Sequence, residues 1–176
     1  MDQRFWHEIE GRPWAEVQAI QEAALRRQLA YLEAASEFYR DKLRAARVQF
    51  DAVKTTADLA RVPLTLKTEL RESLAAQPPL GRHLAAPMSK VIQIQASSGT
   101  TGSPSYVGLT HHDIRVWCEM GARTMFANGL RPGDVCLHGF SMSKGFVGGL
   151  PMVQILQYLG VCDIPVGADA GVERLL

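Results

Sequence analysis

The chain has 176 residues and a formal net charge of +1, so it is long enough to form one domain of ordinary size and to bury a core. Nineteen basic residues balance eighteen acidic ones, which excludes a general attraction to nucleic acid or to an anionic membrane. Residues 1–8 are charged and lack the apolar run of a signal peptide, and no apolar stretch approaches membrane-spanning length.

The three cysteines, Cys118, Cys136 and Cys162, lie far apart in apolar surroundings. Their odd number and the absence of a C-x-x-C pair argue against a disulfide framework, a zinc site or a redox motif. We therefore expect core thiols in a reducing compartment, which indicates a cytoplasmic protein without a metal site.

Charge and glycine content change near residue 90. Residues 1–90 hold 26 of the 37 charged side chains but only two of the 15 glycines, Gly11 and Gly81. A charged, glycine-poor half is typical of surface helices, whereas a glycine-rich half suits strands joined by tight loops. We expect an N-terminal helical region over residues 1–90 and the start of an α/β core over residues 91–176; the two need not fold independently.

Helical signals dominate the first region. Pro13 suits the first position of a helix, and apolar residues follow it at helical spacing. This stripe consists of Val17, Ile20, Ala24, Tyr31, Leu32, Ala35 and Phe38. Packing on the same chain is favoured over a coiled coil with a partner. Shorter helices are expected over residues 37–46 and 67–74. Between them, another short helix with Thr56 as its cap should end before Pro63.

Strands and helices alternate in the second region. Predicted strands cover residues 91–96, 106–109, 135–138 and 161–165, and predicted helices cover residues 110–129 and 151–158. Thr110 as N-cap, with Asp113 three residues later, forms a variant of the capping box. The last strand–helix–strand spacing predicts a parallel βαβ unit. The expected fold class is α/β, with a helical segment followed by part of a mixed β-sheet and flanking helices.

Residues 97–104, with the sequence SSGTTGSP, form a loop of small and hydroxylated residues directly after a predicted buried strand. Glycine lets the backbone approach a ligand closely, and hydroxyl and amide donors suit phosphate oxygens. The loop is not a Walker motif, because Ser103 and Pro104 follow Gly102 where that motif requires lysine and a hydroxyl residue. On composition alone, a phosphate loop and a plain surface turn both stay open.

The loop, together with residues 107–110 and Asp113, resembles the signature of the adenylate-forming (acyl-CoA synthetase) superfamily, and the phenylacetate–CoA ligase branch in particular. Further matching segments in the expected order are residues 37–40 (EFYR), 58–65 (DLARVPLT) with Lys67 and residues 70–71, 130–134 (LRPGD) and 148–149 (GG). The similarity runs from about Phe5 to the last residue. It implies the N-terminal portion of an incomplete adenylate-forming large domain.

The resemblance implies an ATP-dependent aryl- or acyl-acid–CoA ligase that forms an acyl-adenylate and then a CoA thioester, with Mg²⁺ beside the ATP. The implied nucleotide-binding residues are Ser97, Ser98, Gly99, Thr100, Thr101 and Gly102. The sequence ends before the family's magnesium-binding glutamate, ribose-binding aspartate, hinge and catalytic lysine. We therefore expect no catalytic residue and no metal ligand within the chain, and no complete adenylation by it alone. Many family members also carry a basic residue where Ser103 or Ser105 stands here, which puts tight ATP binding in doubt.

Residues 140–149 correspond to the family's acyl-pocket segment, so the resemblance implies Ser141, Phe146 and Gly148 as contacts to a small, aromatic carboxylic acid. The alternative for Phe140 and Phe146 is a purely structural role in the core. His138, His111 and His112 lack metal-ligand spacing, and Lys144 is expected to be a solvated side chain. Two other functions stay open, a non-catalytic nucleotide-binding or oligomerisation module and an adenylation unit that loads a carrier protein, and a homodimer is left open.

Overall fold

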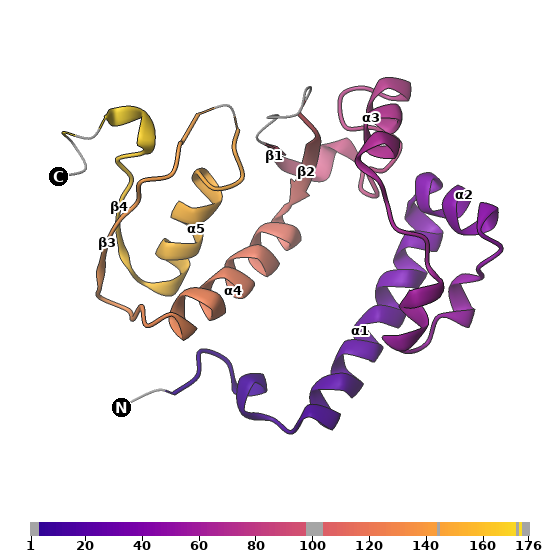
Figure 1. Cartoon of the computed structure of the whole chain (residues 1–176), viewed down its shortest axis with the longest axis horizontal. Helices are drawn as coiled ribbons and strands as arrows, with labels where there is room; N and C mark the ends of the chain where they lie inside the picture. The colour runs from indigo at the N-terminus through magenta and orange to yellow at the C-terminus, as the bar shows by residue number, and fades with distance from the viewer. Residues whose placement is uncertain (1–3, 98–103, 144, 172, 174–176) are drawn as a thin grey trace. The chain divides into compact units, whose positions relative to one another are not determined.

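The structure is a computed structural model and describes residues 4–97, 104–143, 145–171 and 173. The chain divides into two compact units, Gly11–Met88 and a second unit made of Met1–Glu10 with Ser89–Leu176. Figure 1 shows the helices of the first unit and the mixed α/β elements of the second. The α/β class is confirmed. The division into domains at residue 90 stays a prediction.

The first unit is helical. Its elements are α1 (Trp14–Ala35), α2 (Glu37–Ala45) and α3 (Lys67–Ala76), with short 3₁₀ turns at Phe50–Ala52 and Ala57–Arg61. Pro13 is the N-cap of α1 rather than its first helical residue, so that detail of the prediction is wrong. Thr56 is the N-cap residue of the Ala57–Arg61 turn, as predicted, but its side chain makes no cap hydrogen bond. Asp58 instead accepts hydrogen bonds from the backbone N–H groups of Lys54 and Thr55, at 3.0 and 2.9 Å.

The apolar stripe predicted along α1 is only partly covered. Val17 and Leu32 are half-buried, whereas Ile20 and Tyr31 are 40% and 46% exposed. The buried residue of the helix is Leu29, which the predicted stripe omits. The helix is therefore packed along a narrower face than its sequence indicates.

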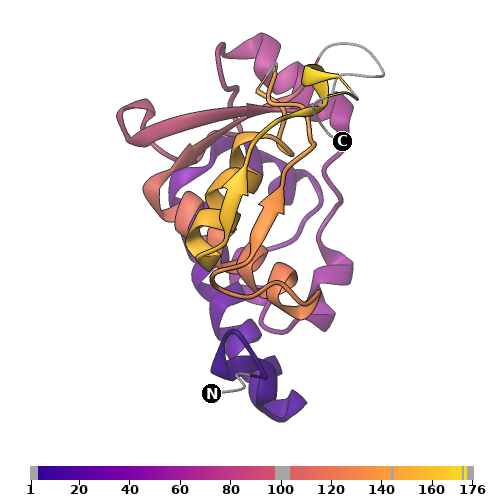
Figure 2. The same cartoon turned by 90° about the vertical axis from the view of Figure 1, so that its left-hand side faces the viewer.

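The second unit holds two small sheets and two long helices. Its elements are β1 (Val91–Ala96), β2 (Tyr106–Thr110), α4 (His111–Ala127), β3 (Val135–Leu137), α5 (Leu150–Leu159) and β4 (Cys162–Ile164), with a 3₁₀ turn at Ala168–Ala170. Two further 3₁₀ turns, Glu8–Gly11 and Met88–Lys90, span the two sequence boundaries between the units. β1 and β2 pair antiparallel. β3 precedes α5 in the sequence and β4 follows it, and these two strands pair parallel, as the βαβ prediction requires. Figure 2 shows β3 and β4 side by side.

The start of α4 follows the predicted capping box. Asp113 Oδ2 accepts from the Thr110 backbone N–H and from its hydroxyl, both at 2.8 Å, and Thr110 Oγ1 accepts from the Asp113 N–H at 3.4 Å. These bonds satisfy groups that a helix end otherwise leaves unpaired. The helix stops at Asn128, and Gly129 follows with φ +104°, a backbone conformation that favours glycine. The exit from β2 is thereby fixed.

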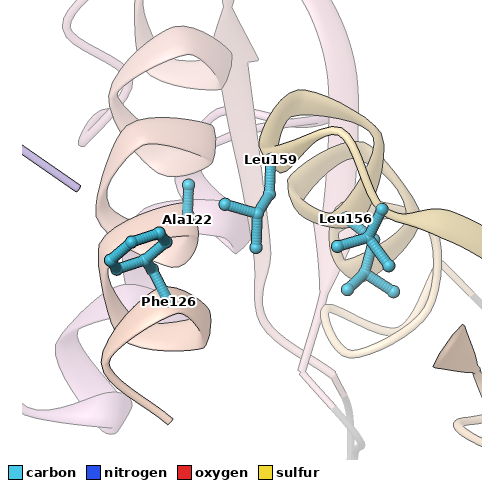
Figure 3. Packing of buried hydrophobic residues seen from close by; sticks show 5 residues of the cluster. Ala122, Phe126, Leu156 and Leu159 are labelled. Atoms are coloured by element: carbon cyan, nitrogen blue, oxygen red, sulfur yellow. The ribbon is translucent and has the colours of Figure 1, made fainter. Parts of the chain in front are cut away.

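The core of the second unit lies between α4 and α5. Ala122 and Phe126 of α4 form one buried cluster with Leu156 and Leu159 of α5 and with Val161 (Figure 3). Trp6, from the start of the chain, packs against this cluster with its ring centroid 5.9 Å from that of Phe126. The indole N–H of Trp6 and the hydroxyl of Tyr158 both donate to Glu119 Oε2, at 3.2 and 2.9 Å. Residues far apart in sequence are thus joined around one carboxylate.

The prediction of three core thiols is wrong for one cysteine. Cys118 is buried and Cys136 is half-buried, but Cys162 is exposed. The reason is strand alternation, since Cys162 and Ile164 point to the face of the parallel sheet opposite Asp163. Across the residues that the structure describes, no helix combines the length and apolar character needed to cross a membrane.

Candidate functional site

The base of the candidate phosphate loop is closed by two hydrogen bonds. The Ser97 backbone N–H donates to the Ser105 carbonyl and the Ser105 N–H donates to Ser97 Oγ, both at 3.0 Å. The hydroxyl of Ser105 is buried and has no hydrogen-bond partner among the described residues. The predicted loop residues Ser98, Gly99, Thr100, Thr101 and Gly102 lie outside the described residues. Of the six predicted nucleotide contacts, the structure therefore places only Ser97.

The candidate acid segment runs beside this loop base. The Ala96 backbone N–H donates to the Gly145 carbonyl at 2.9 Å, and Ala96 and Phe146 form an isolated parallel β-bridge. Gly145 takes φ +65° at this contact. A strand end and a distant turn are thus joined by main-chain pairing, which brings the segment containing Phe146 next to Ser97. Sequence reasoning named both segments but had no signal for their pairing.

Two glycines let the segment fold tightly on itself. A Cβ atom placed on Gly148 would lie 2.6 Å from Phe146 Cε1, so the aromatic ring occupies the space that a side chain would need. A Cβ atom on Gly149 would lie 2.7 Å from the Ser141 carbonyl oxygen. The predicted acid-binding residues Ser141, Phe146 and Gly148 are therefore brought together in one short turn. Their contact with an acid stays a prediction.

The rest of the segment presents polar and apolar groups at the surface. The hydroxyls of Ser141 and Ser143 are 2.8 Å apart, and the Ser143 N–H donates to Ser141 Oγ at 3.3 Å. Phe140 is 54% exposed and Met142 39% exposed, so the alternative of Phe140 as a core residue is wrong. Phe146 is half-buried. Lys144 lies outside the described residues.

Two buried polar side chains, His138 and Asp163, lie next to this segment. His138 follows β3, and its Nε2 lies 3.1 Å from the Gly148 carbonyl oxygen. Its Nδ1 lies 4.0 Å from Asp163 Oδ2, and both side chains are 2% exposed. Neither Nδ1 nor either carboxylate oxygen has a hydrogen-bond partner within the described part of the chain. Sequence reasoning gave no role to Asp163; the signal was a carboxylate at the centre of a short apolar strand.

Cys136 lies opposite Asp163 in the parallel register. Burial raises the pKa of the Cys136 thiol, and the Asp163 carboxylate raises it further, so this cysteine is held as a neutral thiol. His111 and His112 are exposed at the start of α4. Among the described residues, no group of three or more histidine, cysteine, aspartate or glutamate side chains could hold a metal ion.

The helical unit contains a separate pocket of about 530 Å³. Its two basic side chains are already paired, Lys42 with Glu69 at 2.5 Å and Arg82 with Glu37 and Asp41 at 2.7 and 2.8 Å. Because these cations are neutralised by carboxylates, the pocket is a poor site for a phosphate or carboxylate ligand. The turn beside Ser97 is therefore the better candidate site.

Comparison with known proteins identifies related enzymes. The chain is 38% identical over 159 residues to phenylacetate-coenzyme A ligase of Thermus thermophilus, covering 90% of this chain and 34% of that protein. It is 35% identical over 153 residues to the phenylacetate-coenzyme A ligase of Escherichia coli, covering 86% and 33%. No family model matches the chain.

The fold is shared as well. A crystal structure of 2-hydroxyisobutyryl-CoA ligase in complex with 2-HIB-AMP and CoA matches with a TM-score of 0.85 and 34% identity, covering 94% of this chain and 35% of that one. The same ligase in its postadenylation state, in complex with 2-HIB-AMP, matches with a TM-score of 0.86 at 30% identity. In sequence and in fold, the chain is thus related to the adenylate-forming acid–CoA ligases, and it spans about a third of the length of the relatives it matches.

Proposed function

We propose that the chain is part of an ATP-dependent acid–CoA ligase. A carboxylate oxygen of the substrate attacks the α-phosphorus of ATP, pyrophosphate leaves, and an acyl-adenylate is formed. The thiol of CoA then attacks the acyl carbonyl, and AMP leaves with formation of the thioester. The names of the related enzymes support this reaction, since they are acid–CoA ligases and one of them binds an acyl-adenylate together with CoA.

The observation that carries the proposal is the hydrogen bond between the Ala96 N–H and the Gly145 carbonyl. It joins the end of β1, from which the candidate phosphate loop departs, to the turn that carries Phe146. Adenylation needs the acid carboxylate and the α-phosphate side by side, and this pairing supports such an arrangement.

In this proposal, the loop of residues 98–103, with Ser97 at its base, surrounds the phosphates of ATP with backbone and hydroxyl donors. The buried, unpartnered hydroxyl of Ser105 at the loop base suits an additional phosphate or loop contact. Mg²⁺ would enter with the nucleotide and offset charge on the phosphates, because the described residues offer no cluster of ligands to hold it themselves. Ser141, Phe146 and Gly148 form the acid subsite, with Phe146 as a wall for a flat, aromatic acid.

We infer CoA rather than a carrier protein as the acyl acceptor, which is supported by the CoA bound to 2-hydroxyisobutyryl-CoA ligase. Because the chain spans about a third of its relatives, we also infer that it does not complete adenylation alone. We also propose a cytoplasmic location and a homodimeric state. Light scattering after size-exclusion chromatography tests the dimer.

Calorimetric titration of the purified chain with ATP and Mg²⁺ tests the nucleotide site. We expect saturable binding that Gly99→Val weakens by about tenfold or more, since a Cβ and two methyl groups prevent close backbone approach. Ser97→Ala should weaken binding as well, whereas Ser89→Ala, at an exposed serine, should leave it unchanged. Equal binding by the wild-type chain and the Gly99→Val variant would contradict the phosphate-loop assignment. Robust pyrophosphate exchange by the chain alone would contradict the inference that it is incomplete.

A further inference from the structure

His138 and Asp163 form a buried polar pair on the inner face of the parallel sheet. In the register of β3 and β4, Cys136 lies opposite Asp163, and strand alternation puts His138 on the same face. The Nδ1–Oδ2 distance is 4.0 Å and both side chains are 2% exposed. Burying two polar side chains without hydrogen bonds between them is costly, so their presence in a short sheet calls for a function.

The other ring nitrogen of His138 contacts the glycine turn. Nε2 of His138 lies 3.1 Å from the carbonyl oxygen of Gly148. A carbonyl oxygen can only accept a hydrogen bond, so Nε2 must carry a proton and donate it. The ring therefore ties the end of β3 to the glycine turn, and Nδ1 is left facing the carboxylate of Asp163.

The hydrogen bond to Gly148 fixes the orientation of the ring. With Nε2 donating to the Gly148 carbonyl, Nδ1 lies 4.0 Å from Asp163 Oδ2, which is longer than a hydrogen bond. The contact that the geometry supports is therefore the one from Nε2 to the glycine turn, and the Asp163 side chain lies beside the ring.

We propose that His138 is a positioning residue for the acid subsite: its Nε2–H group holds the Gly148 carbonyl and fixes the turn that carries Phe146. The turn is then anchored at two points, by His138 at Gly148 and by the Ala96 N–H at Gly145. The ring of Phe146 packs over Gly148 between these anchors, so displacement of the Gly148 carbonyl moves the proposed wall of the subsite. The inference rests on the proposed function only in its reference to an acid subsite.

Nuclear magnetic resonance of the ¹⁵N-labelled chain tests the pair without a ligand. We expect a slowly exchanging Nε2 proton on the His138 ring, because this proton is buried and bonded to the Gly148 carbonyl. Asp163→Asn leaves the bond to Gly148 in place, so we expect the Nε2 proton to exchange slowly in this variant as well. The matched controls, Asp51→Asn and His112→Gln, change exposed side chains and should leave the His138 signals in place.

Two substitutions at His138 separate positioning from general packing. His138→Gln retains an N–H donor for the Gly148 carbonyl, whereas His138→Leu removes it. We expect the backbone signals of residues 145–149 to shift in the leucine variant and to return largely to their wild-type positions in the glutamine variant. With phenylacetate as the probe, affinity should fall by up to about tenfold in the leucine variant, the size expected for one lost hydrogen bond, and recover in the glutamine variant.

The outcomes separate the two proposals. A rapidly exchanging Nε2 proton on His138 in the wild-type chain, or equal signals for residues 145–149 in the leucine and wild-type chains, would overturn the positioning role. If the leucine variant fails to fold, the exchange of the wild-type Nε2 proton and the His138→Gln spectrum still decide it. Wild-type chain that binds no acid of a panel including phenylacetate and 2-hydroxyisobutyrate, while His138 behaves as expected, would count against the acid subsite and leave the positioning of the turn intact.

Discussion

Gly148→Ala tests whether the turn beside the loop base depends on the space that glycine leaves. Gly148 does not have a positive φ, so alanine can adopt its backbone conformation and the effect is steric. The added Cβ would lie 2.6 Å from Phe146 Cε1 and 3.3 Å from Cδ1 and Cζ. Carbon atoms in contact prefer roughly 3.5–4.0 Å, so the ring has to move by about 1 Å.

The backbone of Phe146 cannot shift freely to carry its ring away from the added Cβ. The Phe146 N–H donates to the Ser143 carbonyl at 3.2 Å, and the Phe146 carbonyl accepts from the Gly149 N–H at 3.0 Å. Overpacking of this kind costs about 1–3 kcal/mol. Alanine also restricts the unfolded chain, which offsets about 0.4–1 kcal/mol. We therefore expect a net loss of about 0.5–2 kcal/mol in the free energy of unfolding.

Urea unfolding followed by tryptophan fluorescence measures this loss, and Phe146→Ala provides the matched background. Without the ring, Gly148→Ala should be neutral or slightly stabilising, so the double-mutant cycle should give a coupling energy of about 1–3 kcal/mol. Additive effects of the two substitutions, within about 0.5 kcal/mol, would refute the packing of Phe146 over Gly148.

Three further predictions concern the scaffold around the site. Thr110→Ala removes the hydroxyl that bonds Asp113, and we expect a loss of about 1 kcal/mol in the free energy of unfolding, measured by chemical denaturation. An unchanged free energy of unfolding would contradict the role of this cap. Leu159→Ala truncates a side chain that is 1% exposed, and we expect a loss of about 2–5 kcal/mol; less than 1 kcal/mol would mean that the α4–α5 core is looser than described. The hydrogen bond to Glu119, with some burial, raises the pKa of Tyr158 above its value in the unfolded chain. Its contribution to stability is therefore present below about pH 10 and lost as pH rises through the folded-state value, so Tyr158→Phe should flatten the alkaline decline seen in pH-dependent melting.

Local signals in the sequence predicted much of the second unit. The strand at residues 91–96, the capping box at Thr110 and Asp113 and the parallel βαβ unit all depend on neighbouring residues or on short spacings. Such features follow from backbone propensity and hydrogen bonds within a few residues, which is why the pattern alone located them.

The missed features depend on contacts between distant segments. The packing of Trp6 on the α4–α5 core and its hydrogen bond to Glu119 join residues more than 100 positions apart. The pairing of Ala96 with Phe146 and the approach of His138 to Asp163 likewise require the fold to be known first. The stripe along α1 was overestimated for a related reason, because apolar periodicity shows which face a helix prefers to bury but not how much of it finds a neighbour.

Under the proposed function, the main-chain link from Ala96 to Gly145 has a thermodynamic consequence for the binding of nucleotide and acid. When a ligand orders one of the two joined segments, the other segment has less conformational entropy left to lose on binding its own ligand. Nucleotide and acid should therefore bind with positive heterotropic linkage, each raising the affinity for the other by the same factor. An enzyme built in this way holds the first ligand weakly until the second arrives, which favours the ternary complex over unproductive binary ones.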